Sequence, residues 1–401
     1  MQLDSEILRQ IDRPPAIVVG VSWANGLGLI RSLGQAGVPV VALDPRPGAI
    51  GLSSRYVTVP LVCPDAGEQE ADFLDFMDRL GEHLDHPGVL FLTRDQDVSA
   101  VSRNQERLER HFLLPFARWD VLSRIVDKPG QLAVAQDAGV PLPVTRFPGS
   151  EEEAAADAGE MPYPAILKPA YHVKFTERFG VKGFVADNAG EALAHYRRGA
   201  AHGYQMMIQE IIPGGEPRLY CYASYLNREG VPMAEFTGRK LRQYPRMFGT
   251  CRLGECCPAP EAAELGLKML RALGFWGVSH VEFKLDPRDN VYKLIEVNAR
   301  NYQWQHMTGV CGADLAYAAY QDMLGKRVTP RVATAYGKRW VLAGTDLMVT
   351  PGEILRGQIS LWDWLGSWRG VAVDGIFSWH DPRPGWRYLR NQGKRRLGGR
   401  S

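Results

Sequence analysis

Acidic and amide side chains alternate with apolar ones in the segment HVEFKLDPRDNVYKLIEVNAR, residues 280–300. The segment predicts two short strands around a turn at residues 288–290, with Glu282 in the first strand and Glu296 in the second. A three-residue turn would place the glutamates opposite each other, where like charges repel. A divalent cation would remove this repulsion, and Asn298 adds an amide oxygen that Mg²⁺ can bind. The pattern indicates a metal site, although spacing alone also allows a half-exposed polar face with the acids splayed apart.

Side-chain alternation along these two strands assigns further residues to faces. It sets Leu294 on the face of Glu296, and Lys284 on the face of Glu282. Lys284 lies close to the turn, where we expect it in solvent. Lys168 differs, because it is the single charged residue of the strand AILKPA, and burying it there requires an anionic partner. We therefore expect an alanine at position 168 to impair function much more than an alanine at position 284.

The composition of the chain is that of a globular protein large enough for two or three compact units. It has 401 residues, of which 45% are hydrophobic, and a formal net charge of +2, which selects no class of partner. No run of residues is apolar for long enough to span a bilayer, and the opening MQLDSEILRQIDRPP lacks the apolar region of a secretory signal. The six irregularly spaced cysteines do not suggest a disulfide framework, so we expect a cytoplasmic protein.

The first clear unit is AIVVGVSWANGLGLIRSLGQAGVPVVALDP. It predicts a strand at residues 16–19, a helix through Leu33 and a second strand at residues 38–43. This order is typical of a Rossmann-like α/β domain, in which Asp44 could hold the ribose of a dinucleotide. The glycines of the first loop do not follow G-x-G-x-x-G, and the chain has no Walker A sequence. We therefore favour a scaffold role for this unit over cofactor binding.

Four motifs follow one another along the rest of the chain. They are SRIVDKPG with Lys128, AILKPA with Lys168, QEIIPGGE at residues 209–216, and Glu282 followed by IEVNAR. Each motif is weak alone. Together and in this order they resemble the ATP-grasp ligases, over roughly residues 15–325.

The resemblance implies ATP and Mg²⁺ as cofactors and assigns roles to ten residues. Six of them would bind the nucleotide. Lys128 and Lys168 would contact its phosphates, Glu210, Ile211 and Ile212 its adenine, and Glu216 its ribose. The implied metal ligands are Glu282, Glu296 and Asn298, and Arg300 would be the catalytic residue beside the reacting acyl phosphate.

The segment after the AILKPA strand departs from the family pattern. Many ATP-grasp enzymes have a run of glycines there, which folds over the phosphates. Here the segment AYHVKFTERFGVKGF has only Gly180 and Gly183, together with Lys174 and Lys182. Which side chains of residues 170–183 contact phosphate stays open.

The resemblance also implies the fold class α/β and an order of domains. A Rossmann-like domain at residues 1–120 would precede a two-lobed ATP-grasp fold. The small lobe at residues 121–205 would close as a lid, and the central lobe at residues 206–330 would hold the metal site. A tryptophan-rich, basic extension would occupy residues 331–401.

The implied activity is ADP-forming ligation. A carboxylate would attack the γ-phosphate of ATP, and the resulting acyl phosphate would be transferred to an amine. Two alternatives stay open, namely carboxylation through carboxyphosphate, as in the biotin carboxylases, and a nucleotide-binding protein without turnover. The expected partners are small-molecule carboxylates and amines that the sequence does not identify. The oligomeric state also stays open, with a dimer as one option.

Several polar residues between the motifs have no assigned role. Lys240, Arg242 and Arg252 could bind an acidic substrate or phosphate, or form a solvent-exposed cationic loop. His306 could line an acceptor pocket, although core packing is the more frequent fate of such a residue. Three cysteines between residues 251 and 257 lack a second ligand pair at zinc spacing, so we do not expect a zinc site.

The C-terminal segment combines tryptophans with cations. Five of the ten tryptophans lie between residues 362 and 386, and no acid follows Asp381. In a helix, one face would carry Arg383, Arg387, Arg390 and Lys394. An apolar stripe could form upstream from Ile354, Leu355, Leu361, Trp362, Leu365 and Trp368. The combination suits peripheral contact with an anionic membrane. We favour tryptophans packed on the ATP-grasp domain with a solvated basic tail, and we do not expect nucleic acid binding, because no recognised motif accompanies the charge.

Overall fold

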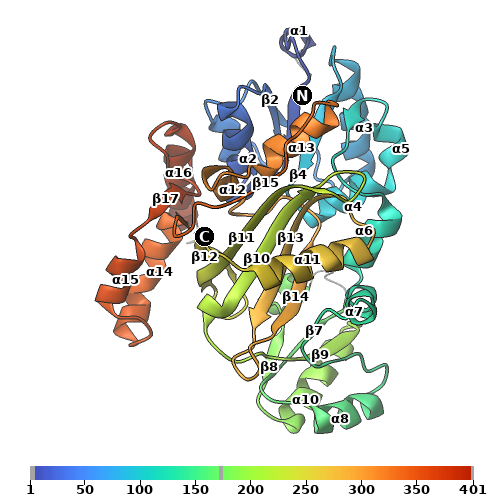
Figure 1. The fold of residues 1–401 in the computed structure, drawn as a ribbon, viewed down its shortest axis with the longest axis vertical. Coiled ribbons are helices and arrows are strands. Elements are labelled where there is room, and N and C mark those ends of the chain that lie inside the picture. Colours follow the sequence, from blue (N-terminus) through green and yellow to red (C-terminus); the bar gives the residue numbers. More distant parts are fainter. Residues whose placement is uncertain (1–4, 171–174, 399–401) are drawn as a thin grey trace.

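The computed structural model describes residues 5–170 and 175–398, which form three sheets with helices packed around them (Figure 1). The sheets are parallel, antiparallel and mixed, which confirms the predicted α/β class. Within these two ranges, no helix has both the length and the apolar character needed to cross a membrane.

The first sheet is parallel and has five strands in the order β3-β2-β1-β4-β5. Every residue of β1, β2 and β4 is buried, as expected for a parallel sheet covered on both faces. Strand β1 matches the predicted residues 16–19, whereas β2 begins at Val40 and not at residue 38. The Rossmann-like label for this domain stays a prediction. The strands are β1 Ala16–Val19, β2 Val40–Asp44, β3 Val59–Val62, β4 Gly88–Leu92 and β5 Phe112–Leu113, and the helices are α1 Ser5–Arg9, α2 Ala24–Gln35, η1 Gly51–Ser53, α3 Glu70–Glu82, α4 Asp95–Arg103 and α5 Gln105–Leu108.

The second sheet is small and antiparallel, with the strand order β6-β9-β7-β8. Helices α8 and α10 pack on it around their own hydrophobic cluster, which includes Leu167, Phe184 and Ile208. Two further helices, α6 and α7, precede it, and Pro129 occupies the first turn of α7 as expected from its missing amide proton. The elements are α6 Trp119–Val126, α7 Lys128–Asp137, β6 Thr145–Arg146, α8 Glu151–Glu160, β7 Ala165–Pro169, α9 Phe175–Phe179, β8 Phe184–Ala186, α10 Ala189–Ala200 and β9 Met206–Glu210.

The third sheet is the largest and has the strand order β14-β13-β10-β11-β12-β16-β17, with β15 beside β11. It shares a hydrophobic core with the first sheet, because Leu90 of β4, Phe275 after α11 and Phe283 of β13 belong to one buried cluster. The first sheet and the hairpin β13–β14 are therefore held in a fixed relation. The elements are η2 Glu216–Arg218, β10 Leu219–Leu226, β11 Pro232–Tyr244, β12 Thr250–Cys256, α11 Pro260–Ala272, β13 Gly277–Leu285, β14 Tyr292–Asn298, α12 His306–Val310, α13 Leu315–Met323 and β15 Arg331–Val332.

The segment predicted as a C-terminal extension joins the third sheet and then adds three helices. Strand β16, Arg339–Val341, pairs with β12, and β17, Val371–Asp374, pairs with β16. Figure 1 shows α14, α15 and α16 along one side of the molecule, away from α8 and α10. These helices are α14 Ala343–Leu355, α15 Leu361–Ser367 and α16 Arg383–Gly398.

The tryptophans of this segment divide into two groups. Trp364 and Trp368 pack inward, and both indole N–H groups donate hydrogen bonds to Asp346, at 2.9 and 3.2 Å. Trp362, Trp379 and Trp386 are exposed. The predicted packing of the tryptophans on the ATP-grasp domain is therefore wrong for the three exposed residues, whereas Trp364 and Trp368 bind Asp346 of α14, within the same C-terminal segment. The predicted apolar stripe is divided between two helices, α14 and α15.

Candidate functional site

A cavity of about 970 Å³ is lined by residues of the second and third sheets and by α4, the helix that follows β4 of the first sheet. Asp95 at the start of α4, Lys168 of β7 and Glu282 of β13 all line it. The structure brings all ten predicted site residues to its walls, namely Lys128, Lys168, Glu210, Ile211, Ile212, Glu216, Glu282, Glu296, Asn298 and Arg300. Their roles stay predictions, but their common location is a finding.

The opening hairpin is formed by β13 and β14, and Glu282 pairs directly with Glu296 as predicted. The turn is longer than expected, because Asp286 and Val291 close a loop of residues 287–290 with a hydrogen bond of 3.0 Å. A bulge between Glu282 and Phe283 compensates for this difference. The bulge also turns Leu294 toward Phe283 and into the core, so the prediction that Leu294 shares the face of Glu296 is wrong.

Each of the two opposed glutamates has a lysine partner. Lys240 Nζ lies 2.7 Å from Glu282 Oε2, and Lys128 Nζ lies 3.1 Å from Glu296 Oε1. Burial acts to raise the pKa of Glu282, but Lys240 and His280 outweigh it and hold the pKa below the usual value. Burial also opposes ionisation of Glu296, yet Lys128 and Lys168 hold its pKa far below the usual value. Both acids are therefore ionised at neutral pH.

The donor set at this hairpin suits a hard divalent cation. Glu282 and Glu296 offer carboxylate oxygens, and the Oδ1 atom of Asn298 accepts a bond of 3.3 Å from Arg300. Among the described residues no group of three or more His, Cys, Asp and Glu side chains could hold a metal ion. Two carboxylates and one amide are too few for a cage built from protein alone. They fit Mg²⁺ that takes further oxygens from substrate phosphates and water.

Lys168 lies on the cavity side of β7 and donates a hydrogen bond of 3.0 Å to Gln209 Oε1. Burial, followed by repulsion from Lys128, lowers the pKa of Lys168 to about 8. Lys182 also lines the cavity, whereas Lys174 lies outside the described residues. The cavity therefore gathers several cations on the side of the small sheet.

The strand end at β9 forms another wall of the cavity. The Glu210 carboxylate accepts a hydrogen bond of 3.2 Å from the amide of Val144 and lies 2.5 Å from Arg288. The amide of Ile211 donates to Pro164 O at 2.9 Å. Among the described residues the amide of Ile212 finds no such partner. The Glu210 carboxylate is thus already bound to Val144 and Arg288, whereas the backbone amide of Ile212 can donate to a ligand.

Lys284 is buried, and the expectation that it lies in solvent is wrong. Its ammonium group donates hydrogen bonds of 2.8 and 2.6 Å to the carbonyl oxygens of Gly214 and Gly215. The lysine therefore fixes the loop that carries Glu216 into the cavity. Burial raises the pKa of Glu216, and its Oε1 atom has no hydrogen-bond partner among the described residues.

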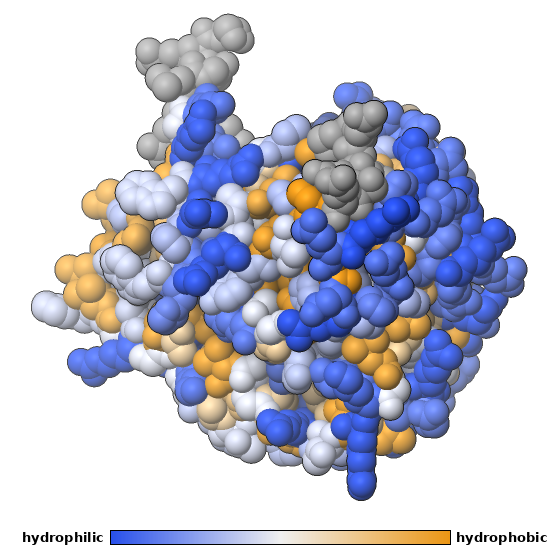
Figure 2. Space-filling view, turned by 90° about the horizontal axis from the view of Figure 1, so that it is seen from above, coloured by the Kyte–Doolittle hydropathy of each residue, from blue (hydrophilic) through white to orange (hydrophobic). Residues whose placement is uncertain are grey.

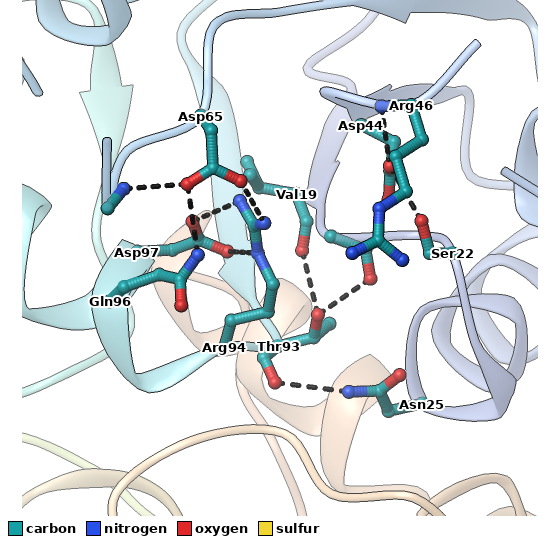
Figure 3. Close-up of polar contacts among 12 residues, drawn as sticks. Val19, Ser22, Asn25, Asp44, Arg46, Asp65, Thr93, Arg94, Gln96 and Asp97 are labelled. Carbon is teal, nitrogen blue, oxygen red and sulfur yellow. Dashed lines mark hydrogen bonds and ion pairs between the residues drawn. The ribbon is translucent and has the colours of Figure 1, made fainter. Parts of the chain in front are cut away.

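Arg300 is positioned by the first sheet. Its Nε atom donates a hydrogen bond of 2.6 Å to Oδ1 of Asp95. Figure 3 shows how the preceding residue, Arg94, lies between Asp65 and Asp97, to which it donates at 2.7 and 2.6 Å. Asp95 follows this network directly and opens α4. Sequence reasoning missed Asp95, because it lies 205 residues from Arg300 along the chain.

Asp44, the candidate ribose ligand of the first unit, is buried and hydrogen-bonded to neighbouring residues. It is 1% exposed, and its Oδ1 atom accepts hydrogen bonds from Ser22 Oγ at 2.7 Å and from the Arg46 amide at 2.9 Å (Figure 3). These contacts occupy the carboxylate with neighbouring residues. The geometry agrees with the scaffold role favoured for this unit.

Four further polar atoms of cavity-lining residues have no hydrogen-bond partner among the described residues. They are Gln243 Nε2, His280 Nε2, the Tyr302 hydroxyl and Gln303 Nε2. His280 stacks on Tyr302 with a centroid distance of 4.2 Å. Burial lowers the pKa of His280 to about 4, so the ring is neutral at pH 7. Sequence reasoning missed these residues, and only the position of Tyr302 and Gln303 just after the IEVNAR motif could have indicated them.

The remaining polar candidates have structural partners. Arg242 and Arg252 are buried and pair with Asp346 and Glu353 of α14, so both the substrate role and the solvent-exposed loop are wrong for them. His306 is absent from the cavity walls. It packs against α2, where a side-chain carbon on Gly28 would come within 3.2 Å of its Cβ. The core-packing alternative is correct for His306.

Comparison with known proteins gives relatives of one kind. No family model matches the chain. D-aspartate ligase of Enterococcus faecium is 24% identical over 261 residues, which is 62% of this chain and 61% of that protein. The arginine-specific large chain of carbamoyl phosphate synthase from Geobacillus stearothermophilus is 28% identical over 179 residues, 42% of this chain and 16% of that one. The chain thus spans less than two thirds of the length of these curated relatives.

Solved structures extend the likeness over more of the chain. N5-carboxyaminoimidazole synthetase from Staphylococcus aureus superposes with a TM-score of 0.63 at 14% identity, covering 87% of this chain and 88% of that one. At this identity the likeness concerns the fold alone. The sequence relatives and the structural neighbours are ATP-grasp ligases, and this chain is similar to them in sequence and in fold.

Proposed function

We propose that this protein is an ATP-dependent, ADP-forming ligase that activates a carboxylate as an acyl phosphate and transfers it to an amine. The observation that carries the proposal is the pair of opposed glutamates, Glu282 and Glu296, each held ionised by a lysine within one cavity. Two opposed ionised acids repel each other, and here the repulsion is offset by two lysines that also line the cavity, where phosphate oxygens could replace the carboxylates as their partners.

The nucleotide would lie along the walls described above. Lys128 and Lys168 would contact phosphate oxygens, and Lys128 would leave Glu296 in exchange for that contact. Among the described residues, the amide of Ile212 has no backbone acceptor and suits a ring nitrogen of adenine. Glu216 Oε1 accepts no hydrogen bond from those residues, lies 3.9 Å from Arg246 Nε, and suits a ribose hydroxyl. Glu210 would shape the adenine end through its backbone, since its carboxylate is already bound to Arg288.

Glu282, Glu296 and Asn298 would hold Mg²⁺ against the phosphates. When bound, the ion neutralises phosphate oxygens that would otherwise repel an incoming carboxylate. Once Mg²⁺ binds Glu282, Lys240 would be released from it, and its ammonium group would lie beside the incoming substrate carboxylate. Positive charge would therefore lie beside both the phosphates and the substrate carboxylate.

The reaction then takes two displacement steps. A carboxylate oxygen attacks the γ-phosphorus, the bond to the bridging oxygen breaks, and ADP leaves. The amine nitrogen next attacks the acyl carbon, the carbon–oxygen bond to phosphate breaks, and the nitrogen releases a proton to solvent. Arg300, held by Asp95, would stabilise the charge that develops on the acyl oxygen. Closure of the small sheet over the cavity would exclude water from the acyl phosphate.

The direct test is release of ADP by the purified protein with ATP and Mg²⁺, measured with a panel of amino acids, other small carboxylates and amines. The proposal expects release only when a matching carboxylate is present. Release driven by bicarbonate alone would instead identify a carboxylase, a reaction class suggested by neighbours such as biotin carboxylase. Tight binding of ATP without any release across the panel would favour the non-catalytic alternative.

Affinity for ATP is expected to fall as the pH rises from about 7 to about 9. Lys168, with a pKa of about 8, is mostly protonated below that value and loses its charge above it. Binding of the triphosphate favours the charged form, so the affinity falls by up to about tenfold per pH unit above the pKa. Isothermal titration at several pH values measures this dependence.

Two lysine variants make the pH experiment specific. Lys168→Met should weaken binding at pH 7 and flatten the pH dependence. Lys268→Met is the control, because Lys268 is exposed on α11 and does not line the cavity. An unchanged pH dependence in Lys168→Met would contradict the assignment of Lys168 to the phosphates.

Removal of the Tyr302 hydroxyl is expected to weaken binding of the carboxylate or the amine but not of ATP. Tyr302 is 3% exposed, and its hydroxyl has no partner among the described residues, whereas its ring is held by His280. Tyr302→Phe should raise the KM of one substrate about fivefold to tenfold, as expected for one lost hydrogen bond. Tyr320→Phe, which removes a hydroxyl bonded to Pro14 far from the cavity, is the control. Equal kinetics of both variants would exclude Tyr302 from the substrate site.

A further inference from the structure

The outward side of α16 combines exposed tryptophan and leucine with cations. We name this set, together with the preceding Trp379, the α16 outer face, and it consists of Trp379, Arg383, Trp386, Leu389, Arg390 and Lys394. The exposed fractions of Trp379, Trp386 and Leu389 are 98%, 72% and 50%. Such exposure is unusual for tryptophan, which is largely buried in most proteins. Within the described residues none of the three cations forms an ion pair.

The opposite side of α16 is anchored, so the outer face has a fixed direction. Tyr388 is buried and packs against Trp23 and Phe377, each with a centroid distance of 5.9 Å. Arg387 donates a hydrogen bond to Pro47 O, and Asn391 donates one of 2.9 Å to Gly48 O. The prediction that four cations share one face of the helix is therefore wrong for one of them. Arg387 turns inward, and Trp386 and Leu389 stand among the other three.

The chemistry of this face fits an interface between water and lipid. An indole ring has an apolar body and a polar N–H group, which suits the headgroup level of a bilayer, and arginine and lysine attract anionic headgroups. On the left of Figure 2, where Figure 1 places α14 to α16, hydrophobic patches lie beside hydrophilic residues. The α16 sequence contains no acid that would repel an anionic surface.

We propose that the α16 outer face docks the protein onto an anionic membrane surface. The cations require an anionic partner. Leu389 and the two tryptophans require that this partner also has an apolar layer beneath its charged surface, as a lipid bilayer has. Nucleic acid offers the charge, but its phosphate backbone gives Leu389 nothing to pack against. The docking does not depend on the proposed ligase activity.

Flotation of the purified full chain with lipid vesicles tests the proposal. The chain should float with vesicles of phosphatidylcholine and phosphatidylglycerol at low salt, stay behind with phosphatidylcholine alone, and be released as salt screens the charges. The variant Arg383→Gln/Arg390→Gln/Lys394→Gln should lose affinity by a factor of about five for each cation. Trp379→Ser/Trp386→Ser should also lose binding, and both variants should keep the melting temperature of the parent.

A matched control separates this face from general surface charge. Lys326, Arg327 and Arg331 are also exposed cations, near the end of α13 and in β15, and their replacement by glutamine removes the same charge. This control should float like the parent protein. The proposal is overturned if the full chain stays in the bottom fraction with anionic vesicles, if the control loses as much binding as the test variant, or if the chain binds duplex DNA at that salt and ignores the vesicles.

Discussion

Replacing Glu296 by glutamine is expected to lower ATP-dependent turnover at least about a hundredfold while the fold stays intact. The substitution keeps the shape of the side chain and removes the charge that faces Lys128 and Glu282. A metal held against phosphates by two carboxylates and one amide would lose one of its strongest ligands, which is an effect of the size seen when a single preorganised electrostatic contact is removed. Initial rates of ADP release at several Mg²⁺ concentrations measure the effect.

The control for this experiment is Glu264→Gln, which removes a charge from the exposed side of α11. It should leave the rate unchanged. Asn298→Ala should behave like Glu296→Gln, because the amide oxygen lies on the same strand face. Near-parental turnover of both site variants at saturating Mg²⁺ would contradict the metal assignment, and a lowered melting temperature would show that the loss is structural.

Replacing Asp346 by asparagine is expected to destabilise the protein by about 3 to 5 kcal/mol. Asp346 is fully buried, and it accepts two hydrogen bonds of 2.9 Å from Arg242 together with bonds from Trp364 and Trp368. Arg252 Nε lies 3.5 Å away. Asparagine preserves the volume, but it leaves buried guanidinium charge without a counter-ion, which costs more than the pair itself contributes.

Urea unfolding and thermal melting, both followed by tryptophan fluorescence, measure this destabilisation, and Trp364 and Trp368 report directly on the site. Asp85→Asn is the control, because Asp85 is exposed and its loss should change neither midpoint measurably. Adding Arg242→Met to Asp346→Asn should restore part of the lost stability, since it removes one of the stranded charges. A midpoint of Asp346→Asn equal to that of the control would mean that the network does not hold α14 and α15 to the large sheet.

The sequence was most informative where local patterns decide the structure. Alternation along residues 280–300 predicted that Glu282 and Glu296 face each other, and the resemblance to the ATP-grasp ligases implied ten site residues, which share one cavity. Both depend on contacts between neighbours along a strand or on a recurrent chain order. The turn length was wrong, however, and only the bulge at Glu282 restored the predicted pairing.

By itself, the sequence determined the α/β class, the first strand and the paired acids, because strand periodicity is a local property, and its resemblance to a known family implied the candidate ligands. Tertiary structure alone decided that Lys240 lies on Glu282, that Asp95 holds Arg300, that Lys284 is buried and that Arg387 turns inward. The partners of Lys240 and Arg300 lie 42 and 205 residues away along the chain. The sequence around a charged side chain does not show which distant residue will neutralise it, because that partner is determined by how the three sheets pack together.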